Sequence, residues 1–117
     1  MKVTEFGKFL RRLRVDRDLV LKDMADVLDV SSAFLSSLEL GKKPIPTNFE
    51  EKIIKGFNLD DVQAQELRQA ARISQPSVKI ELTGKTTEER EMVMSFARKY
   101  ESLSDEQKRK LKILLGD

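Results

Sequence analysis

Apolar side chains recur every three or four residues along the first part of the chain, a spacing that places them on one face of an α-helix. Between Thr4 and Arg17 this spacing predicts a first helix, with Thr4 or Val3 at its N-cap. The apolar positions of this helix are Phe6, Phe9, Leu10 and Leu13. We therefore expect that face to lie against a core and the opposite, charged face to lie in water.

Two shorter helices are predicted next, separated by a tight turn. The first runs from about Leu21 to Leu28, and Asp29-Val30-Ser31 then interrupts the pattern. Ser31 or Ser32 caps the second, which ends at Gly41, a residue that readily adopts the left-handed conformation. The predicted inward residues are Met24, Val27, Leu28, Leu35 and Leu38. Two helices of about eight residues joined in this way have the form of a helix-turn-helix, and the rest of the domain must bury them.

Two further helices complete the predicted first domain. Thr47-Asn48-Phe49-Glu50 has the pattern of a capping box and predicts a fourth helix that reaches about Phe57. Asp60-Asp61-Val62-Gln63 opens a fifth helix. Its inward residues are expected to be Leu67, Ala70, Ala71 and Ile73. With five helices around one core, the first domain is predicted to cover residues 1–74.

Residues Val78–Leu82 alternate apolar and polar side chains with a period of two, which predicts a short β-strand with one buried face. No second strand is visible in the sequence, although backbone donors and acceptors need partners. Two interpretations stay open at this point. Either the strand pairs with the same strand of a second subunit, or the segment is an irregular extended linker.

Thr86 and Ser104 begin two more predicted helices, which together form a C-terminal hairpin. A hairpin of this size buries too little apolar surface to be stable alone. Residues 75–117 are therefore expected to form a segment for dimerisation or for binding a partner protein. The predicted dimerisation residues are Val78, Ile80, Leu82, Phe96 and Tyr100.

Composition narrows the possible classes of protein. The chain of 117 residues is 39% hydrophobic and 36% charged, which is typical of a soluble, helix-rich protein. No apolar run approaches the roughly 20 residues of a membrane span, and no signal peptide is visible, so we expect a cytoplasmic protein. Cysteine and histidine are both absent, which removes the usual zinc ligands, thiol chemistry and the commonest general base. We expect no enzymatic activity, no metal and no cofactor.

Positive charge is unevenly placed, although the formal net charge is only +2. Residues 1–46 hold nine Lys or Arg against seven Asp or Glu, whereas residues 47–117 hold 13 of each. Lys42 and Lys43 directly follow the third predicted helix. Others crowd the first helix: Lys8, Arg11, Arg12 and Arg14. This placement, more than the small surplus, indicates contact with nucleic acid.

Two sequence runs are distinctive: FLSSLELGKK at residues 34–43 and FGKFLRRLR at residues 6–14. With them, residues 5–73 resemble the lambda-repressor-like (XRE, Cro/repressor) DNA-binding domains. The first run is similar to the end of that family's recognition helix, and the second is similar to its first helix. The resemblance implies an all-α fold: a five-helix lambda-repressor-like helix-turn-helix domain, followed here by the short β-strand and the helical hairpin.

Three positions depart from the family's pattern. Where the family usually has a polar residue followed by a Gln that bonds a DNA phosphate, this chain has Val20 and Leu21, and Leu21 cannot make that bond. Where the family's turn usually has Gly, this chain has Asp29, and Asp tolerates a left-handed backbone better than most residues do. The turn is therefore expected to form, without the phosphate contact of the Gln.

The outward face of the helix at residues 31–40 carries Leu40 and otherwise small side chains, which let it approach base edges closely. It lacks Arg, Asn and Gln, so specificity is expected to depend on phosphate positioning, water and DNA shape. The resemblance implies that Lys42 and Lys43 contact phosphates. The predicted DNA-binding residues are Ser31, Ser32, Ala33, Phe34, Ser36, Ser37, Lys42, Lys43 and Arg11.

The resemblance also implies a structural ion pair between Arg14 and Glu39, joining the first and third helices. Plainer alternatives stay open for several of these residues. The small-residue face could pack on another helix, and the ring of Phe34 could fold into the core. Glu39, Arg11 and the two lysines could be ordinary solvated charges.

Together these features predict a sequence-specific DNA-binding transcriptional regulator, expected to be a repressor. It would bind an inverted-repeat operator in double-stranded DNA as a homodimer. The alternative is an antitoxin-like protein, whose C-terminal segment binds a partner toxin while its DNA-binding half autoregulates the operon.

Overall fold

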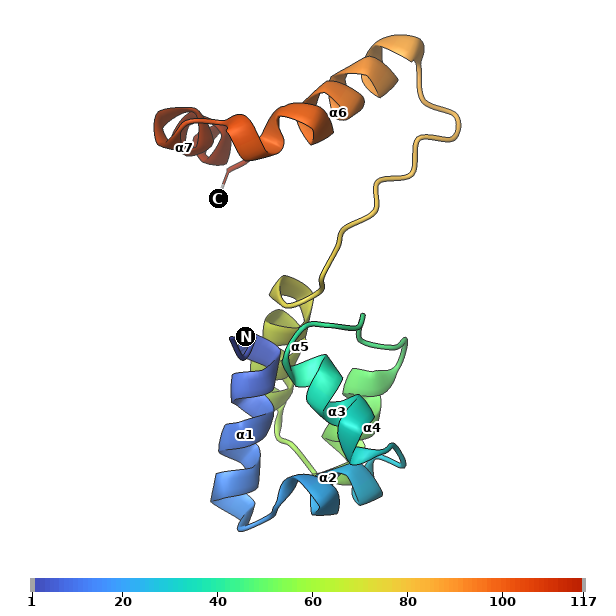
Figure 1. The fold of residues 1–117 in the computed structure, drawn as a ribbon, viewed down its shortest axis with the longest axis vertical. Helices are drawn as coiled ribbons and strands as arrows, with labels where there is room; N and C mark the ends of the chain where they lie inside the picture. Colours follow the sequence, from blue (N-terminus) through green and yellow to red (C-terminus); the bar gives the residue numbers. More distant parts are fainter. Residues whose placement is uncertain (1, 117) are drawn as a thin grey trace. The chain divides into compact units, whose positions relative to one another are not determined.

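The structure, a computed structural model, describes residues 2–116 (Figure 1). The chain divides into two compact units, the first ending at Val78 and the second beginning at Lys79. The five helices predicted for the first domain are present: α1 (Glu5–Arg17), α2 (Leu21–Val27), α3 (Ser32–Glu39), α4 (Phe49–Gly56) and α5 (Asp61–Ile73). The second unit contains α6 (Thr87–Lys99), the short 3-10 helix η1 (Tyr100–Ser102) and α7 (Asp105–Leu114). Each helix of residues 2–116 is too short or too polar to cross a lipid bilayer.

Side-chain oxygens begin most of these helices where the sequence predicts a cap. The hydroxyl of Thr4 caps α1, that of Ser31 caps α3, and the carboxylate of Asp60 caps α5. The capping box predicted at residues 47–50 is wrong. Asn48 holds the N-cap position of α4 with φ of 69° and makes no side-chain cap bond, and the N–H of Phe49 donates to the Pro46 carbonyl at 3.1 Å. The left-handed backbone at Asn48 thus replaces the extended N-cap that a capping box requires.

The first four helices end in the same way, through one residue with a left-handed backbone. These residues are Asp18, Asp29, Gly41 and Asn58, with φ of 56°, 57°, 71° and 50°. After each, the next N–H donates to the carbonyl five residues back, which satisfies a group that the helix end leaves free. Asp29 therefore does form the turn between α2 and α3 that the sequence predicts.

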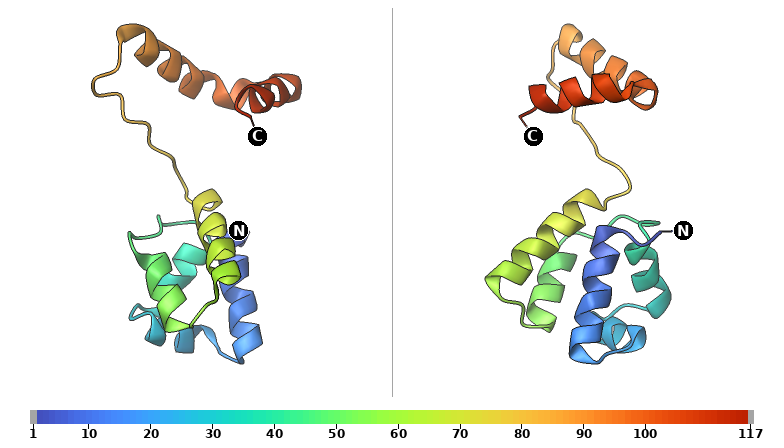
Figure 2. Two further views of the ribbon diagram at one scale, coloured as in Figure 1. Left: turned by 180° about the vertical axis from the view of Figure 1, so that it is seen from behind. Right: turned by 90° about the vertical axis from the view of Figure 1, so that its left-hand side faces the viewer.

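The core of the first unit is built by all five helices, with α1 lying beside α5 and also contacting α3 (Figures 1 and 2). The largest fully buried apolar side chains are Phe6, Leu10, Met24, Leu28, Leu35, Leu38, Ile53 and Leu67. Two predicted inward residues are instead exposed, Val27 at 51% and Ile73 at 62%. In α2 the buried face is formed by Met24, Ala25 and Leu28, and because successive positions turn by about 100°, Val27 lies outside it.

The predicted β-strand at Val78–Leu82 is wrong, since residues 2–116 form no strand. Val78 is 89% exposed and Ile80 55% exposed, so the alternating pattern has no buried face. From Ser77 to Glu81 the backbone makes no backbone hydrogen bond to any described residue. A strand needs a partner for its N–H and C=O groups, and residues 2–116 supply none to this segment. The segment is an irregular linker between the two units.

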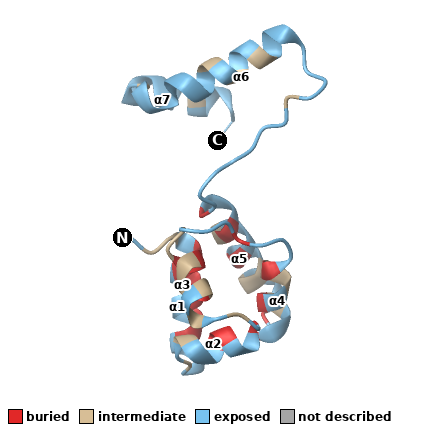
Figure 3. Cartoon of the chain, turned by 45° about the vertical axis from the view of Figure 1, so that its right-hand side comes forward, coloured by how far each residue is buried: buried red, intermediate tan, exposed pale blue. Residues whose placement is uncertain are grey.

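The second unit contains the two predicted helices but no buried residue among those described (Figure 3). α6 packs on η1, where the rings of Phe96 and Tyr100 lie 5.8 Å apart, and it makes no extensive contact with α7. The amino group of Lys108 lies 5.8 Å from the Tyr100 ring centroid. Two helices are therefore formed without the shared core of a packed hairpin.

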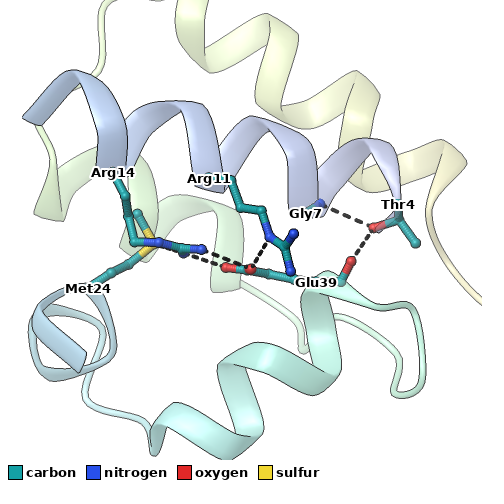
Figure 4. A network of polar contacts seen from close by, with 6 residues as sticks. All are labelled: Thr4, Gly7, Arg11, Arg14, Met24 and Glu39. Carbon is teal, nitrogen blue, oxygen red and sulfur yellow. Dashed lines mark hydrogen bonds and ion pairs between the residues drawn. The ribbon is translucent and has the colours of Figure 1, made fainter. Parts of the chain in front are cut away.

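Gly7 lies in the interior of α1, where alanine would ordinarily be more stable by about 1 kcal/mol. A Cβ built at this position would lie 2.3 Å from the Glu39 carbonyl oxygen and 2.6 Å from Cγ1 of Val3. Figure 4 shows Gly7 on the side of α1 that faces the end of α3. The absence of a side chain thus allows α1 and the last turn of α3 to approach each other closely.

We expect Gly7→Ala to lower the free energy of unfolding by about 1–3 kcal/mol, the range for overpacked sites, because the clashing atom belongs to a helix backbone. Urea denaturation followed by circular dichroism measures the change. Lys8→Ala, on the exposed side of the same helix, should shift stability by less than about 0.5 kcal/mol. Equal stability of the Gly7→Ala protein and the parent would show that α3 moves aside at no cost.

Candidate nucleic-acid interface

An ion pair attaches α3 to α1 inside the first unit. Nη1 of Arg14 donates to Oε2 of Glu39 at 2.5 Å, and Nη2 donates to Oε1 at 3.1 Å (Figure 4). The Glu39 side chain is 2% exposed and that of Arg14 is 11% exposed. Nη1 also contacts Sδ of Met24 on α2 at 3.3 Å. The two residues that the family resemblance paired are in direct contact, and a fork of two bonds fixes their orientation.

The backbone of Glu39 is held as well as its side chain. The hydroxyl of Thr4 donates to the Glu39 carbonyl at 2.9 Å and accepts from the N–H of Gly7 at 3.1 Å. The N–H of Thr4 donates to the same carbonyl at 3.1 Å. Nε of Arg11 lies 3.5 Å from Oε1 of Glu39, with half of the Arg11 side chain in solvent. The last turn of α3 is therefore fixed to the start of α1 by several bonds.

The outward face of α3 is lined by small side chains. Ser31 and Ala33 are exposed, and Ser32, Ser36 and Ser37 are half-buried. The Ser31 oxygen accepts the N–H of Phe34 at 3.0 Å, which leaves its O–H as a donor. Leu35 and Leu38 lie on the opposite face, fully buried, as the helical wheel predicts. The face combines hydroxyl groups and a methyl group without any long side chain.

Phe34 lies at the edge of this face. Its ring is half-buried and packs against the core cluster, and the amino group of Lys43 lies 5.4 Å from the ring centroid. The sequence left open whether this ring points outward or inward. The structure places it at the boundary, where it packs on the core and supports a cation at the same time.

Lys42 and Lys43 are exposed in the loop after α3, and both ends of this loop are anchored. At its start Lys42 donates its N–H to the Ser37 carbonyl at 3.0 Å. At its end the N–H of Ile45 donates to Oε1 of Gln75 at 3.0 Å. Gln75 is predicted to lie outside the first domain, in the segment 75–117, and no local pattern in the sequence indicates this contact.

Charge differs between the two ends of α3. The positive groups, Lys42, Lys43 and Arg11, lie near its C-terminal end. The preceding helix and turn carry Asp23, Asp26 and Asp29.

Two of the carboxylates of α2 are engaged in local contacts. The Asp23 carboxylate accepts the N–H of Val20 at 2.9 Å, and Lys22 pairs with Asp26 at 3.1 Å. Leu21, in place of the family's Gln, packs against the core. A polyanion would therefore be attracted to the C-terminal side of α3 and less to the side of α2.

The arrangement is that of a helix-turn-helix unit inside a five-helix domain. Residues 5–67, more than half of the chain, match the family described as a helix-turn-helix domain. The chain belongs to this family, and the family and the fold together define a DNA-binding regulator. A search of curated proteins found no match, and a search of solved structures also found none.

Replacing Glu39 by Gln would leave the Arg14 guanidinium buried without its counter-charge. We expect a loss of roughly 3–5 kcal/mol in the free energy of unfolding, the range for breaking a buried pair. Glu51→Gln is the matched control, because it breaks the exposed pair with Arg68, worth under about 1 kcal/mol. Urea denaturation of both proteins measures the difference, and similar small losses would contradict a buried, structural role for Glu39.

Proposed function

We propose that this protein is a sequence-specific transcriptional regulator of the lambda-repressor-like (XRE) type that places α3 in the major groove of double-stranded DNA. The observation that carries this proposal is the contrast between the two faces of α3. One face is fixed to the domain through Leu35, Leu38 and Glu39. The other carries mainly small side chains, with the Phe34 ring at its edge, so the helix backbone can lie close to the base edges. We infer repression as its mode of action, because a bound domain can block a site without any second activity.

Base contacts would come from the serines and the alanine of α3. Serine hydroxyls donate to or accept from several bases, and the Ala33 methyl group can contact a thymine methyl group. No long side chain on this face can form a bidentate bond to one base pair. Much of the specificity would therefore arise from the fixed orientation of α3, bridging water and DNA shape.

Phosphate contacts would come mainly from Lys42 and Lys43, with Arg11 nearby. Their loop is anchored at both ends, so the two lysine side chains extend from a defined position on the domain. The α2 side provides no equivalent anchor, because Leu21 is apolar and Asp23 carries negative charge. We therefore expect the lysine loop to supply a large share of the salt-dependent affinity.

We also propose that the regulator acts as a homodimer on an inverted repeat, with residues 75–117 joining the subunits. One α3 contacts only a few base pairs, and helix-turn-helix domains generally obtain affinity from two half-sites. The exposed apolar side chains of α6 and α7 support this assignment. The alternative, an antitoxin-like protein, would use the same DNA-binding domain. In that case a partner toxin, and not a second subunit, would cover α6 and α7.

The combined change Ser36→Glu and Ser37→Glu should abolish specific binding, because two carboxylates would face the phosphate-lined groove. Gel shifts would use a site first selected from a random DNA pool. Gln65→Glu with Gln69→Glu is the matched control, since both glutamines are exposed on α5 and the same charge is added. Circular dichroism checks that both variants fold. Full affinity in the folded serine variant would overturn the role of α3.

Replacing Lys42 and Lys43 by Ala should weaken binding about equally on all sequences and lower the log–log salt slope by up to about two units. The control, Arg12→Ala with Arg72→Ala, also removes two positive charges. Those arginines line grooves along α5 and should alter the slope less. Titrations at several salt concentrations give both slopes. A changed sequence preference with an unchanged slope would argue against phosphate contacts by the lysines.

A further inference from the structure

α6 and α7 carry apolar side chains that nothing covers among the described residues of the second unit. Met92, Phe96 and Tyr100 follow one side of α6 and η1 at intervals of four, and each is at least 43% exposed. Leu114, the last residue of α7, and Leu115, its C-cap, are 80% and 67% exposed. Helices of this length are only marginally stable in water when they stand alone. Their apolar faces therefore require a partner surface.

The charges on the two helices run in the same order along the chain, from acidic at the start to basic at the end. α6 begins with Glu88 and Glu89 and ends with Arg98 and Lys99. α7 begins with Asp105 and Glu106, and its positive residues, Lys108, Arg109, Lys110 and Lys112, follow from its fourth position onward. Within residues 2–116 no ion pair joins α6 to α7. Lys110 pairs with Glu106 within α7 at 3.6 Å, but the charges of α6 are not matched by those of α7 inside one chain.

An antiparallel contact between an α6 and an α7 would match charge at both ends. The acidic start of α6 would face the basic half of α7, and the basic end of α6 would face the acidic start of α7. When two copies of the chain meet about a two-fold axis, this contact forms twice. A surface with this order of charges is therefore complementary to a second copy of itself.

We propose that α6 and α7 dock on α7 and α6 of a second copy of this chain, in antiparallel pairs. The inference rests on the homodimer of the proposed function and names its contact surface. The apolar residues Met92, Phe96, Leu111 and Leu115 form the centre, and the charged residues flank it. Glu88 and Glu89 precede Met92 by four and three residues, so they lie next to the apolar face of α6. Lys108 and Lys112 lie next to Leu111 and Leu115 in the same way.

Charge reversal tests the pairing in the full-length chain. One variant carries Glu88→Lys and Glu89→Lys, and the other carries Lys108→Glu and Lys112→Glu. Each variant alone would place like charges together twice in a dimer, so each should sediment as a monomer at a concentration where the parent is a dimer. An equimolar mixture should recover the dimer mass, because each altered helix then meets an oppositely charged partner.

The mixture separates the proposal from its alternatives. Pairing of α6 with α7 of the same chain would give no recovery on mixing, and a monomeric parent would leave binding of another protein as the leading explanation. Either result overturns the proposal, as does a dimer of either variant alone. Unchanged thermal unfolding of the first unit shows that this unit remains folded, and recovery of the dimer on mixing shows that the altered helices still form.

A second comparison tests the apolar centre. Phe96→Glu should abolish the dimer, whereas Met94→Glu, on another side of the same helix and similarly exposed, should preserve it. Equal effects of the two changes would contradict the assigned face. Sedimentation is done without DNA, so a parent dimer that binds no selected DNA would overturn the proposed function and leave the pairing intact.

Discussion

The contact between the last turn of α3 and the first half of α1 is the constraint on which the DNA-facing surface depends. A buried ion pair of this kind is weak evidence for net stability, because taking both charges out of water offsets much of their attraction. Its value here is geometric. The planar guanidinium of Arg14 donates two hydrogen bonds to the Glu39 carboxylate, which holds it in one orientation, and the missing side chain at Gly7 sets the distance between the helices. Rotation and depth of α3 are fixed together, so its small side chains face outward in one arrangement.

Much of the first unit could be predicted from local sequence, because single capping residues determine where its helices begin and end. Thr4, Ser31 and Asp60 cap helices through their own oxygens, and Asp29 takes the left-handed turn. The prediction failed at residues 78–82, where alternation describes the side chains and says nothing of a pairing strand. It also misplaced Val27, because the spacing of apolar residues in so short a helix fits more than one face.

Contacts between distant segments had no signal in the sequence. The N–H of Phe6 donates to the hydroxyl of Ser74 at 2.9 Å, and the side chain of Gln75 accepts from the N–H of Ile45. Ser74, at the predicted end of the domain, and Gln75, predicted to lie beyond it, therefore both close the domain. Met24 beside Arg14 is a further example, since its sulfur reads only as an apolar position. The pairing of these groups is determined by the tertiary structure and not by the local sequence. Only a three-dimensional arrangement brings them within hydrogen-bonding distance.

The linker between the units has a consequence for how two DNA-binding halves would share one site. No backbone hydrogen bond to a described residue holds Ser77–Glu81 in one conformation. Fully extended, Pro76–Lys85 spans at most about 35 Å at 3.3–3.6 Å per residue, which is close to one helical turn of DNA. In a dimer joined through α6 and α7, binding of one DNA-binding domain would raise the effective concentration of the other domain at the DNA. The length of the linker would set an upper limit on the distance between two half-sites. Below that limit, the same dimer could bind half-sites at many different separations.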